Sequence, residues 1–563
     1  MMSSSSKKYS DKYVIAIDKE ITYQPQKIVL NGKNLTIQEV LAVSRNKFNF
    51  ELTTDSKVIN RIEECFQKMM EDVKNGVPVY GANTGYGAQA SRVLTQGSPT
   101  ERVNLAKLIS EGIAHVDVTV GPTFSADVIR AAILIRINML MQGVSGIKID
   151  DLKIYQQLLN NQITPVVNQY GGIGASGDLA HNGRVLSAAR GLKGVQVWNK
   201  TGKIVEASEA LKKAHIPLLN LNPKAGLGLV NGDNFSSALA LLLTVDTLEL
   251  LLISTVVGAM MIEVLHGTDR SFHPVLSEVR PHPGQREVAS LYRYLLKGSK
   301  LAYQEMSGHQ LRPDGIKVQD AYSLRGISQY QGVNFEKIKS LLEIIEININ
   351  SVSDNPLWVP PEYTVDDEKP WQWVSGGNFL AMHMVEVMDS LRKIMTQIVK
   401  LNDRHLARLV NPNDNNGLPP NLSDKSAITG CAFKGVQIQS GMFEVYSSLL
   451  SIPVSTFFGV HEEGNQDITS HALTSGIFGL ENLRIARYSI AQNLLAVAQA
   501  VDFRGGITKL SPKTQAVYKL IRDSVDYLGE EKPLNNDIEA IYQALINGDL
   551  INLIREKVFS EYS

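Results

Sequence analysis

The sequence has little cysteine and almost no excess charge. Its 563 residues include two cysteines, Cys65 and Cys431, which lie far apart in the chain and do not suggest a disulfide framework. This usage fits a reducing compartment, and we expect the protein to be cytoplasmic. The formal net charge is -1 at pH 7 and the pI is about 6.9, so we expect no nucleic acid as a partner.

The sequence also lacks a long hydrophobic run. The longest uncharged and mostly apolar stretch, Leu250 to Ile262, lies between Glu249 and Glu263 and is too short to span a bilayer. We therefore expect a helix buried in a protein core and no membrane partner. Residues 1–22 carry a serine run and lack the apolar core of a signal peptide, which predicts a disordered tail.

Metal-binding patterns are missing as well. Residues 461–465 read His-Glu-Glu-Gly-Asn, which differs from the zinc motif H-E-x-x-H because Asn465 stands in place of the second histidine. The 11 histidines show no other metal-like spacing. We predict no metal site.

Helical periodicity is the main pattern that is present. Apolar residues recur at helical spacing in 338–349, 380–401 and 483–501, whereas strand-like alternation is scarce. Helices of this length must cover one another's apolar faces, so we predict an all-α fold around a bundle of long helices. After the tail we expect an N-terminal region, a central bundle and a C-terminal helical region: residues 23–225, 226–530 and 531–563.

A glycine-rich stretch at 171–178 has the composition of a loop that can react with itself. If the loop is held tightly, the amide nitrogen of Gly177 can attack the carbonyl carbon of Ala175, and two waters leave, one of them with the hydroxyl of Ser176. The product is 4-methylidene-imidazol-5-one (MIO), an electrophile made from backbone. Glycine suits such a compressed turn. Taken alone, the stretch could equally be a plain glycine-rich turn.

Two other glycine motifs fit this stretch poorly. Residues 172–177 match G-x-G-x-x-G, but the dinucleotide-binding form needs an acidic residue about 20 positions further on. No Asp or Glu occurs from Leu179 to Val205. The nucleophile elbow G-x-S-x-G fails because Asp178 stands where its last glycine would be. We predict no nucleotide cofactor.

Eight short segments, in the same order, resemble motifs of the aromatic amino acid ammonia-lyase and aminomutase family. They are residues 80–87, 174–179, 231–232, 322–325, 354–356, 376–379, 416–420 and 465–467. The resemblance runs from about residue 25 to 540. It implies a fumarase/aspartase-like helical bundle, the MIO group on Ala175, Ser176 and Gly177, and a homotetramer whose active sites are shared between subunits.

The resemblance also implies roles for single residues. Tyr80 matches the base that removes the β-hydrogen of the substrate, and nearby positive charge would have to lower the pKa of its phenol. Arg325 matches the clamp for the substrate carboxylate, assisted by Asn355. The residues matched to positions around the electrophile and the substrate amine are Asn231, Gln319, Tyr322, Phe379 and Gln466.

Two neighbouring positions indicate the substrate. In the family a histidine there favours tyrosine, Ser-His favours histidine and Phe-Leu favours phenylalanine. Leu108 and Ile109 stand there in this chain and would leave a buried hydroxyl or imidazole nitrogen without a partner, at about 1 to 3 kcal/mol. The resemblance therefore implies L-phenylalanine, with trans-cinnamate and ammonia as products. Lys434 and Glu462 match the same subgroup.

Other activities stay open at this point. An aromatic amino acid 2,3-aminomutase uses the same residues and returns ammonia to the β-carbon. A lyase for tyrosine, histidine or another aromatic amino acid is a further alternative. An inactive binding protein is the third, and the intact Tyr80, Ser176 and Arg325 argue against it.

Four residues near the reactive loop or near Asn231 depart from the family's pattern: His181, Arg184, Ala225 and Asp233. The family usually has Glu at position 225 and Thr at position 233. An unusual substrate would be one reason for these departures. We expect instead that Arg184 and Asp233 compensate each other as a charge pair.

Overall fold

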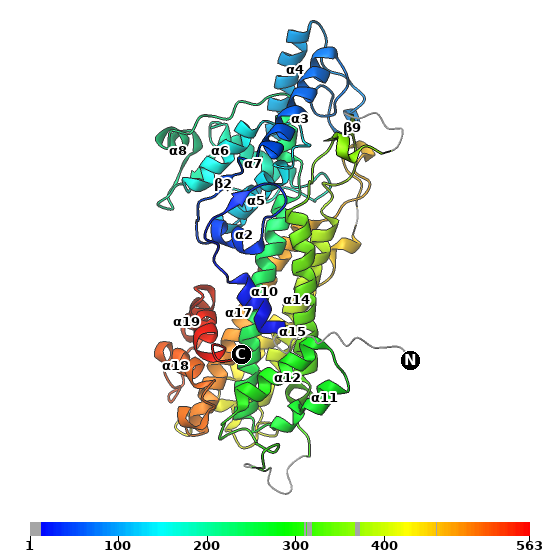
Figure 1. Cartoon of the computed structure of the whole chain (residues 1–563). Coiled ribbons are helices and arrows are strands. Elements are labelled where there is room, and N and C mark those ends of the chain that lie inside the picture. Colours follow the sequence, from blue (N-terminus) through cyan, green and yellow to red (C-terminus); the bar gives the residue numbers. More distant parts are fainter. Residues whose placement is uncertain (1–12, 309–310, 312–317, 366–371, 458, 563) are drawn as a thin grey trace, which may run out of the picture.

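Long helices run along the axis of an elongated molecule (Figure 1). The structure is a computed structural model that describes residues 13–308, 311, 318–365, 372–457 and 459–562. The four longest helices pack on one another, and they are α10 (Asn234–Val264), α14 (Ile327–Ile349), α15 (Met382–Val410) and α17 (Ala472–Phe503). The predicted bundle of long helices is confirmed.

Helix α10 forms the centre of this bundle. It contacts α14, α15 and α17 and also α5 (Ala126–Leu140) of the N-terminal region. By length and composition the segment Ala225–Val264 could cross a membrane, yet 89% of its most apolar window is buried inside the protein. A helix that is apolar all round needs such cover on every side. The predicted buried helix at 250–262 lies within α10.

The N-terminal region sits at one end of the bundle (Figure 1). Its further helices are α2 (Ile37–Ser44), α3 (Ser56–Asn75), α4 (Pro99–Gly112), α6 (Ile149–Asn160), α7 (Leu179–Ala189), α8 (Ala207–Lys213) and α9 (Ala225–Val230). Helix α4 begins at a capping box in which Ser98 and Glu101 each bind the other's backbone N–H. Pro99 then occupies the first helical position, where no N–H partner is needed.

Strands in the described residues are short and form small local sheets. The pairs are parallel β1 (Val29–Leu30) with β2 (Glu51–Leu52), and antiparallel β3 (Val120–Thr123) with β5 (Asn168–Tyr170) and β8 (Leu357–Trp358) with β9 (Trp373–Val374). A three-stranded antiparallel sheet contains β4 (Thr164–Pro165), β6 (Gln196–Trp198) and β7 (Ile204–Glu206). These sheets brace loops and do not form a core layer.

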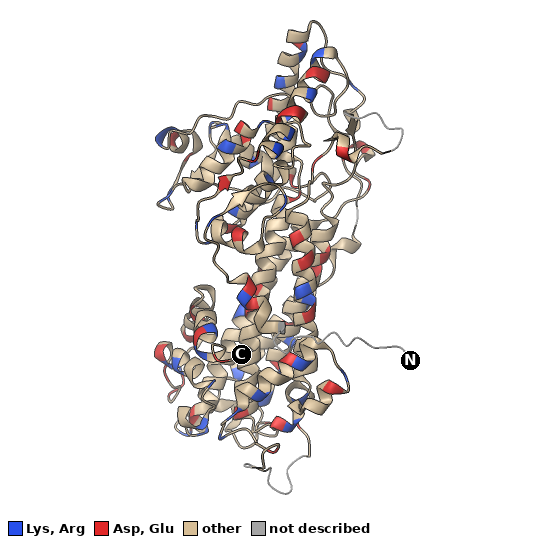
Figure 2. Ribbon diagram, in the orientation of Figure 1, with Lys and Arg blue, Asp and Glu red and all other residues tan. Residues whose placement is uncertain are grey.

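The opposite end of the bundle carries shorter helices. They are α11 (Pro274–Glu278), α12 (Pro283–Leu296), α13 (Tyr322–Arg325), α16 (Lys434–Leu450), α18 (Gln515–Ser524), α19 (Asn535–Ile546) and α20 (Asp549–Leu553). Figure 2 shows Lys and Arg interspersed with Asp and Glu at both ends of the molecule. The near-zero net charge is therefore spread out as a mixture of both signs.

The predicted disordered tail is wrong for residues 13–21, which form helix α1 (Tyr13–Ile21). Val14, Ile17 and Ile21 are buried, and α1 packs on α12. The backbone N–H groups of Val14 and Ile15 donate to the carboxylate of Glu287. Apolar residues at helical spacing gave this helix a face to bury. Residues 1–12 lie outside the described part of the chain.

Candidate active site

The predicted reactive loop is a tight turn directly before α7. Gly174 and Gly177 adopt φ angles of 70° and 72°, the left-handed region that favours glycine. A Cβ atom on Gly177 would lie 2.6 Å from the carbonyl carbon and oxygen of Gly232. Only glycine fits there, so the compression that cyclisation needs is built into the backbone.

One wall of this turn is the Asn231–Gly232 segment. The Asn231 side-chain amide donates to the carbonyl oxygen of Ser176 at 2.8 Å. The backbone N–H of Asp178 donates to the carbonyl of Gly232, also at 2.8 Å. These bonds hold the middle residue of the reactive triplet and the residue that follows it against the Asn231–Gly232 segment.

The opposite wall comes from residues 466–470. The Gln466 side-chain amide donates to the hydroxyl oxygen of Ser176 at 2.8 Å, which places a hydrogen-bond donor on the oxygen that would leave. The Ser470 hydroxyl donates to the carbonyl oxygen of Gly174 at 2.9 Å. The turn is therefore held from both sides by hydrogen bonds.

Three helices begin around the turn. Helix α7 starts at Leu179, and α17 starts at Ala472, whose backbone nitrogen would lie 3.3 Å from a Cβ on Gly174. At the start of α10, the Asp178 carboxylate accepts from the N–H and the hydroxyl of Ser236 at 2.8 and 2.9 Å. Burial raises the pKa of Asp178 to about 7. The positive ends of these helices favour negative charge on a group between them.

Tyr80 lies on the same end of the molecule, in the loop after α3. Its hydroxyl accepts a hydrogen bond from the N–H of Gly87 at 2.9 Å, and its ring meets that of Tyr86 edge-on with centroids 6.3 Å apart. Burial raises the pKa of Tyr80, the Gly87 N–H lowers it, and the charge of Glu462 raises it further. Within one chain, the expected lowering by a nearby cation is thus not found among the described residues.

Glu462 and Ile109 contact this tyrosine loop, and Leu108 precedes Ile109 on α4. Glu462 packs directly over Gly87, where a Cβ would lie 1.5 Å from its Oε1 atom. The hydroxyl of Tyr86 donates to the carbonyl of Ile109 at 3.0 Å, so α4 and the loop are joined. The side chain of Leu108 is 63% exposed in the single chain and is free to contact a ligand or another subunit.

Asn355 and Phe379 lie on the stretch between α14 and α15. Asn355 follows Asp354, and its side-chain oxygen accepts from the N–H of Gly376 at 2.9 Å. Phe379 is half-buried beside Asn378, whose amide donates to the carbonyl of Val352 at 3.3 Å. The first bond joins Asn355 to Gly376, and the second joins Asn378, the neighbour of Phe379, to Val352 just after the C-terminal end of α14.

Three of the predicted site residues lie away from the reactive turn: Gln319, Tyr322 and Arg325. The Arg325 guanidinium is 4.5 Å from the ring centroid of Tyr322, whose side chain is 80% exposed. Together with Thr268 and Glu305 they line a hollow of about 390 Å³. This hollow opens at the end of the bundle where α14 begins.

A single chain does not bring the reactive turn and Tyr80 close to the second group of residues, Gln319, Tyr322 and Arg325. Arg325 lies two positions before the start of α14, while Asn348 near the other end of this helix donates to Asp233 at 3.0 Å. The 23 residues of α14 span roughly 33 Å at about 1.5 Å per residue. Lys434, exposed at the start of α16, makes no side-chain contact with either group among the described residues.

The expected Arg184–Asp233 pair is wrong. Arg184 lies 2.9 Å from the carboxylate of Asp117 instead, and Asp233 is engaged by Asn348. Arg184 is on α7 and its side chain points to the segment before β3, whereas Asp233 opens α10. Arg184 follows the reactive loop in sequence and Asp233 follows Asn231-Gly232, and the two side chains face different partners.

His181 and Ala225, the other two departures, are both buried. The His181 ring packs between Phe124 and Phe235, with centroids 5.6 and 5.4 Å away. Burial lowers the pKa of His181 to about 4, and its Nε2 atom lies 3.0 Å from the carbonyl oxygen of Gln169. A neutral imidazole at this position packs near Gly172 in the reactive loop, where an added Cβ would lie 3.5 Å from the ring.

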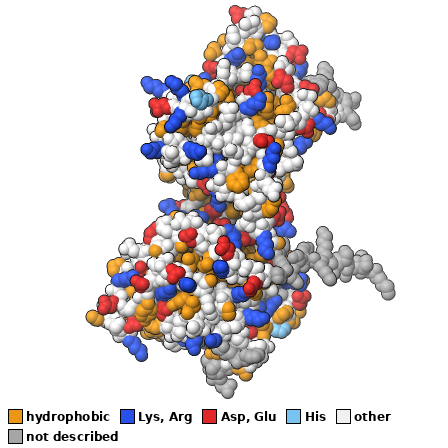
Figure 3. Space-filling view, turned by 60° about the vertical axis from the view of Figure 1, so that its left-hand side comes forward, with side chains coloured by type: hydrophobic (Ala, Val, Ile, Leu, Met, Phe, Trp, Pro, Cys, Tyr) orange, Lys and Arg blue, Asp and Glu red, His pale blue; other side chains and the backbone are white. Residues whose placement is uncertain are grey.

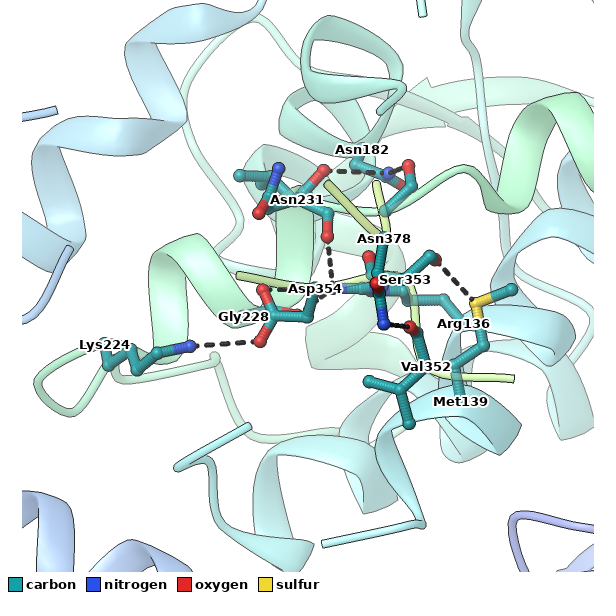
Figure 4. A network of polar contacts seen from close by, with 12 residues as sticks. Arg136, Met139, Asn182, Lys224, Gly228, Asn231, Val352, Ser353, Asp354 and Asn378 are labelled. Atoms are coloured by element: carbon teal, nitrogen blue, oxygen red, sulfur yellow. Dashed lines mark hydrogen bonds and ion pairs between the residues drawn. The ribbon is translucent and has the colours of Figure 1, made fainter. Parts of the chain in front are cut away.

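Arg136 is a residue that the motif comparison missed. It is fully buried on α5, and its guanidinium donates to the carbonyls of Gly228 and Asn231 at 2.5 and 3.1 Å (Figure 4). It therefore fixes the backbone from which the Asn231 side chain reaches Ser176. The only sign of this role in the sequence was the position of Arg136, a charged residue within the apolar run 131–140.

Comparison with known proteins decides the family. The sequence model for aromatic amino acid lyases matches residues 35–523. The chain belongs to this family. A phenylalanine ammonia-lyase of Nostoc punctiforme is 32% identical over 562 residues, covering 95% of each chain. A histidine ammonia-lyase of Myxococcus xanthus is 32% identical over 530 residues, covering 94% of this chain and 98% of the relative.

Solved structures agree with this membership of the aromatic amino acid ammonia-lyase and aminomutase family. A tyrosine aminomutase of Streptomyces globisporus superimposes with a TM-score of 0.83 at 27% identity, covering 94% of this chain and 99% of its own. The family is of the MIO-dependent type, and the compressed turn at 175–177 fits that group. No cluster of three or more His, Cys, Asp or Glu side chains suited to a metal ion occurs among the described residues.

Proposed function

We propose that the chain eliminates ammonia from L-phenylalanine and releases trans-cinnamate. One observation carries the proposal: the turn at Ala175–Gly177 is compressed against Gly232, with Ser176 bound by Asn231 and Gln466. An amine is a poor leaving group, so its elimination needs an electrophile. The MIO group made from this turn would supply that electrophile by capturing the substrate amine.

The surrounding side chains would do the remaining work. The Tyr80 hydroxyl, as phenolate, takes the proton from the β-carbon of the substrate. Its hydrogen bond from Gly87 stabilises the phenolate form. Asn231 and Gln466 orient the turn, and the positive ends of α7, α10 and α17 stabilise negative charge that develops there.

The carboxylate clamp would come from a second copy of the chain. Arg325 offers two parallel donors for a carboxylate, but it lies a helix length from Ser176 within one chain. The exposed face of α16 supports assembly, since Ile438, Met442 and Val445 are each more than half exposed. Figure 3 shows hydrophobic side chains interspersed with charged ones on the visible face of the single chain. A homotetramer with shared sites would bring Arg325 to Tyr80.

The substrate assignment rests on α4. Leu108 and Ile109 offer no polar side chain to a ring substituent. An unsubstituted phenyl ring has no polar group that would lose its hydrogen bonds to water on binding, so its desolvation costs the least free energy. The chain is equally similar to a phenylalanine and a histidine ammonia-lyase. Histidine as substrate and 2,3-aminomutase activity are therefore the outcomes that the test must separate.

The test is incubation of the purified protein with L-phenylalanine, L-tyrosine and L-histidine in turn. Arylacrylate is followed by absorbance, and β-amino acid is quantified by chiral chromatography. We expect cinnamate from phenylalanine without β-phenylalanine. Accumulating β-phenylalanine would identify an aminomutase, and urocanate from histidine as the main product would overturn the argument from Leu108 and Ile109.

A further inference from the structure

A buried histidine of the bundle lies behind the short helix that carries Tyr322 and Arg325. His405 on α15 is 1% exposed, and its Nε2 atom lies 2.9 Å from the carbonyl oxygen of Ser323 in α13. The two residues are 82 positions apart in the chain. This hydrogen bond therefore ties α13 to one of the long helices of the bundle.

The protonation of the His405 imidazole follows from its surroundings. A carbonyl oxygen can only accept a hydrogen bond, so the Nε2 atom carries the hydrogen and donates to Ser323. Among the described residues, the Nδ1 atom has no hydrogen-bond partner. Burial lowers the pKa of His405 to about 4, the bond to Ser323 raises it, and the charge of Arg408 lowers it further. The imidazole is therefore neutral at neutral pH and has a single N–H donor, which binds Ser323.

Helix α13 needs support from outside because it is a single turn. It contains four residues, Tyr322–Arg325, and a helix this short is not stable by itself in water. Its contacts to the bundle are made by the Leu324 side chain, which is 6% exposed, and by the Ser323 carbonyl. Tyr322 and Arg325 extend from the same turn into the hollow that they line. The direction of both side chains thus depends on how the turn is anchored.

A second hydrogen bond holds the chain just before α13. The backbone N–H of Thr268 donates to the Asp320 carboxylate at 2.9 Å, and Thr268 lines the same hollow. One contact alone would leave the turn free to rotate about it. Contacts at Asp320 and at Ser323 together fix the orientation of α13.

We propose that His405 is a positioning residue for the carboxylate clamp: its Nε2–H bond to Ser323 holds α13 so that Arg325 and Tyr322 face the substrate. This inference rests on the proposed function, in which Arg325 binds the substrate carboxylate. The described residues that line the hollow do not include His405. His405 therefore acts on the substrate only through α13.

Two substitutions of equal side-chain length separate the hydrogen bond from the bulk of the imidazole. His405→Met removes the donor, whereas His405→Gln keeps an N–H donor at nearly the same reach. KM and kcat for L-phenylalanine are measured for both, with the inhibition constant of trans-cinnamate, which also carries a carboxylate. For His405→Met we expect KM and the inhibition constant to rise about tenfold, with a smaller change in kcat, because the carboxylate is bound before and during the reaction. His405→Gln should restore both constants to within about threefold of the unmodified values.

Asn493→Leu is the matched control for the loss of a buried hydrogen bond. Asn493 on α17 is also 1% exposed, and its amide donates to the carbonyl of Asn402 on α15 at 3.1 Å. Its Oδ1 atom, like the Nδ1 atom of His405, has no hydrogen-bond partner in the described part of the chain. Asn493→Leu should lower the denaturation midpoint as His405→Met does, but it should leave KM unchanged.

Hydrogen exchange reports on α13 without any substrate. The backbone amides of residues 322–326 should exchange about tenfold faster in His405→Met than in the unmodified protein, and at nearly the unmodified rate in His405→Gln. Should His405→Met not fold, His405→Asn takes its place, because its shorter amide does not reach the Ser323 carbonyl.

Unchanged exchange in the folded variant that lacks the donor would overturn the inference, as would an unchanged KM. An unmodified protein that neither converts L-phenylalanine nor binds trans-cinnamate would instead overturn the proposed function. In that case the exchange rates still decide whether His405 holds α13.

Discussion

At the scale of single residues, the environment of Tyr80 is the clearest chemical finding. The motif identified the tyrosine, but its pKa depends on neighbours that the motif does not contain. Gly87 and Glu462 act on the phenol in opposite directions, and burial outweighs the favourable hydrogen bond. The sequence could identify Tyr80 as the proposed base, but it could not give the direction in which the pKa of Tyr80 is shifted within one chain.

A pH profile tests this base. The pKa of Tyr80 is raised, and in the proposed mechanism the phenolate is the active form, so kcat/KM for L-phenylalanine should rise with pH across the neutral range. Tyr80→Phe should remove this rise and lower kcat/KM by about a hundredfold or more. Tyr86→Phe, which loses only a bond to the Ile109 carbonyl, should keep the profile. A flat profile in the unmodified enzyme between pH 6 and 9 would contradict the role of burial.

At the scale of elements, the long helices followed from apolar spacing alone, because each must bury one face. The contacts that form the wall of the reactive turn could not be predicted from apolar spacing. Arg136 and Asn231 are separated by 95 residues, and a contact of that kind depends on how α5 and α9 pack. For the same reason Arg184 could be placed near the loop in sequence but not given its partner, Asp117.

Gly232 offers a test of this packing. A methyl group at Gly232 would meet the buried Arg136 guanidinium and the Ser353 carbonyl. Gly232→Ala should therefore lower the free energy of unfolding by about 1 to 3 kcal/mol and slow dehydration of the turn. In contrast, Gly441→Ala within α16, where no atom lies within 4 Å of the added methyl, should not lower the free energy of unfolding, because alanine favours a helix more than glycine does, and should leave dehydration unchanged. Equal denaturation midpoints for Gly232→Ala and the unmodified protein would refute this packing of Gly232 against Arg136.

At the scale of the whole molecule, the two groups of site residues are too far apart to act in one chain. The family resemblance supplied both groups, and only the structure shows that α14 separates them. Within the described residues, the reactive turn and Tyr80 share one end of the bundle, while Arg325 and Tyr322 share the other. Assembly of several chains would unite them.

Mixed oligomers test this arrangement. Tyr80→Phe and Arg325→Ala should each be nearly inactive alone, because each removes one half of every site. Co-expression of the two variants should restore part of the activity, since some sites would then receive an intact residue from each chain. Mixed oligomers that form, as shown by two affinity tags, and yet remain inactive would argue for sites built within one chain.

The central claim is that residues 175–177 become an electrophile. The most direct measurement is the mass of the peptide containing residues 171–178, taken from the purified protein and from Ser176→Ala. We predict that the peptide from the unmodified protein is lighter than its sequence mass by two waters. The variant has no hydroxyl to lose, keeps its Ala175 carbonyl oxygen and should have its full sequence mass. A peptide of full mass from an unmodified, folded protein would contradict the account.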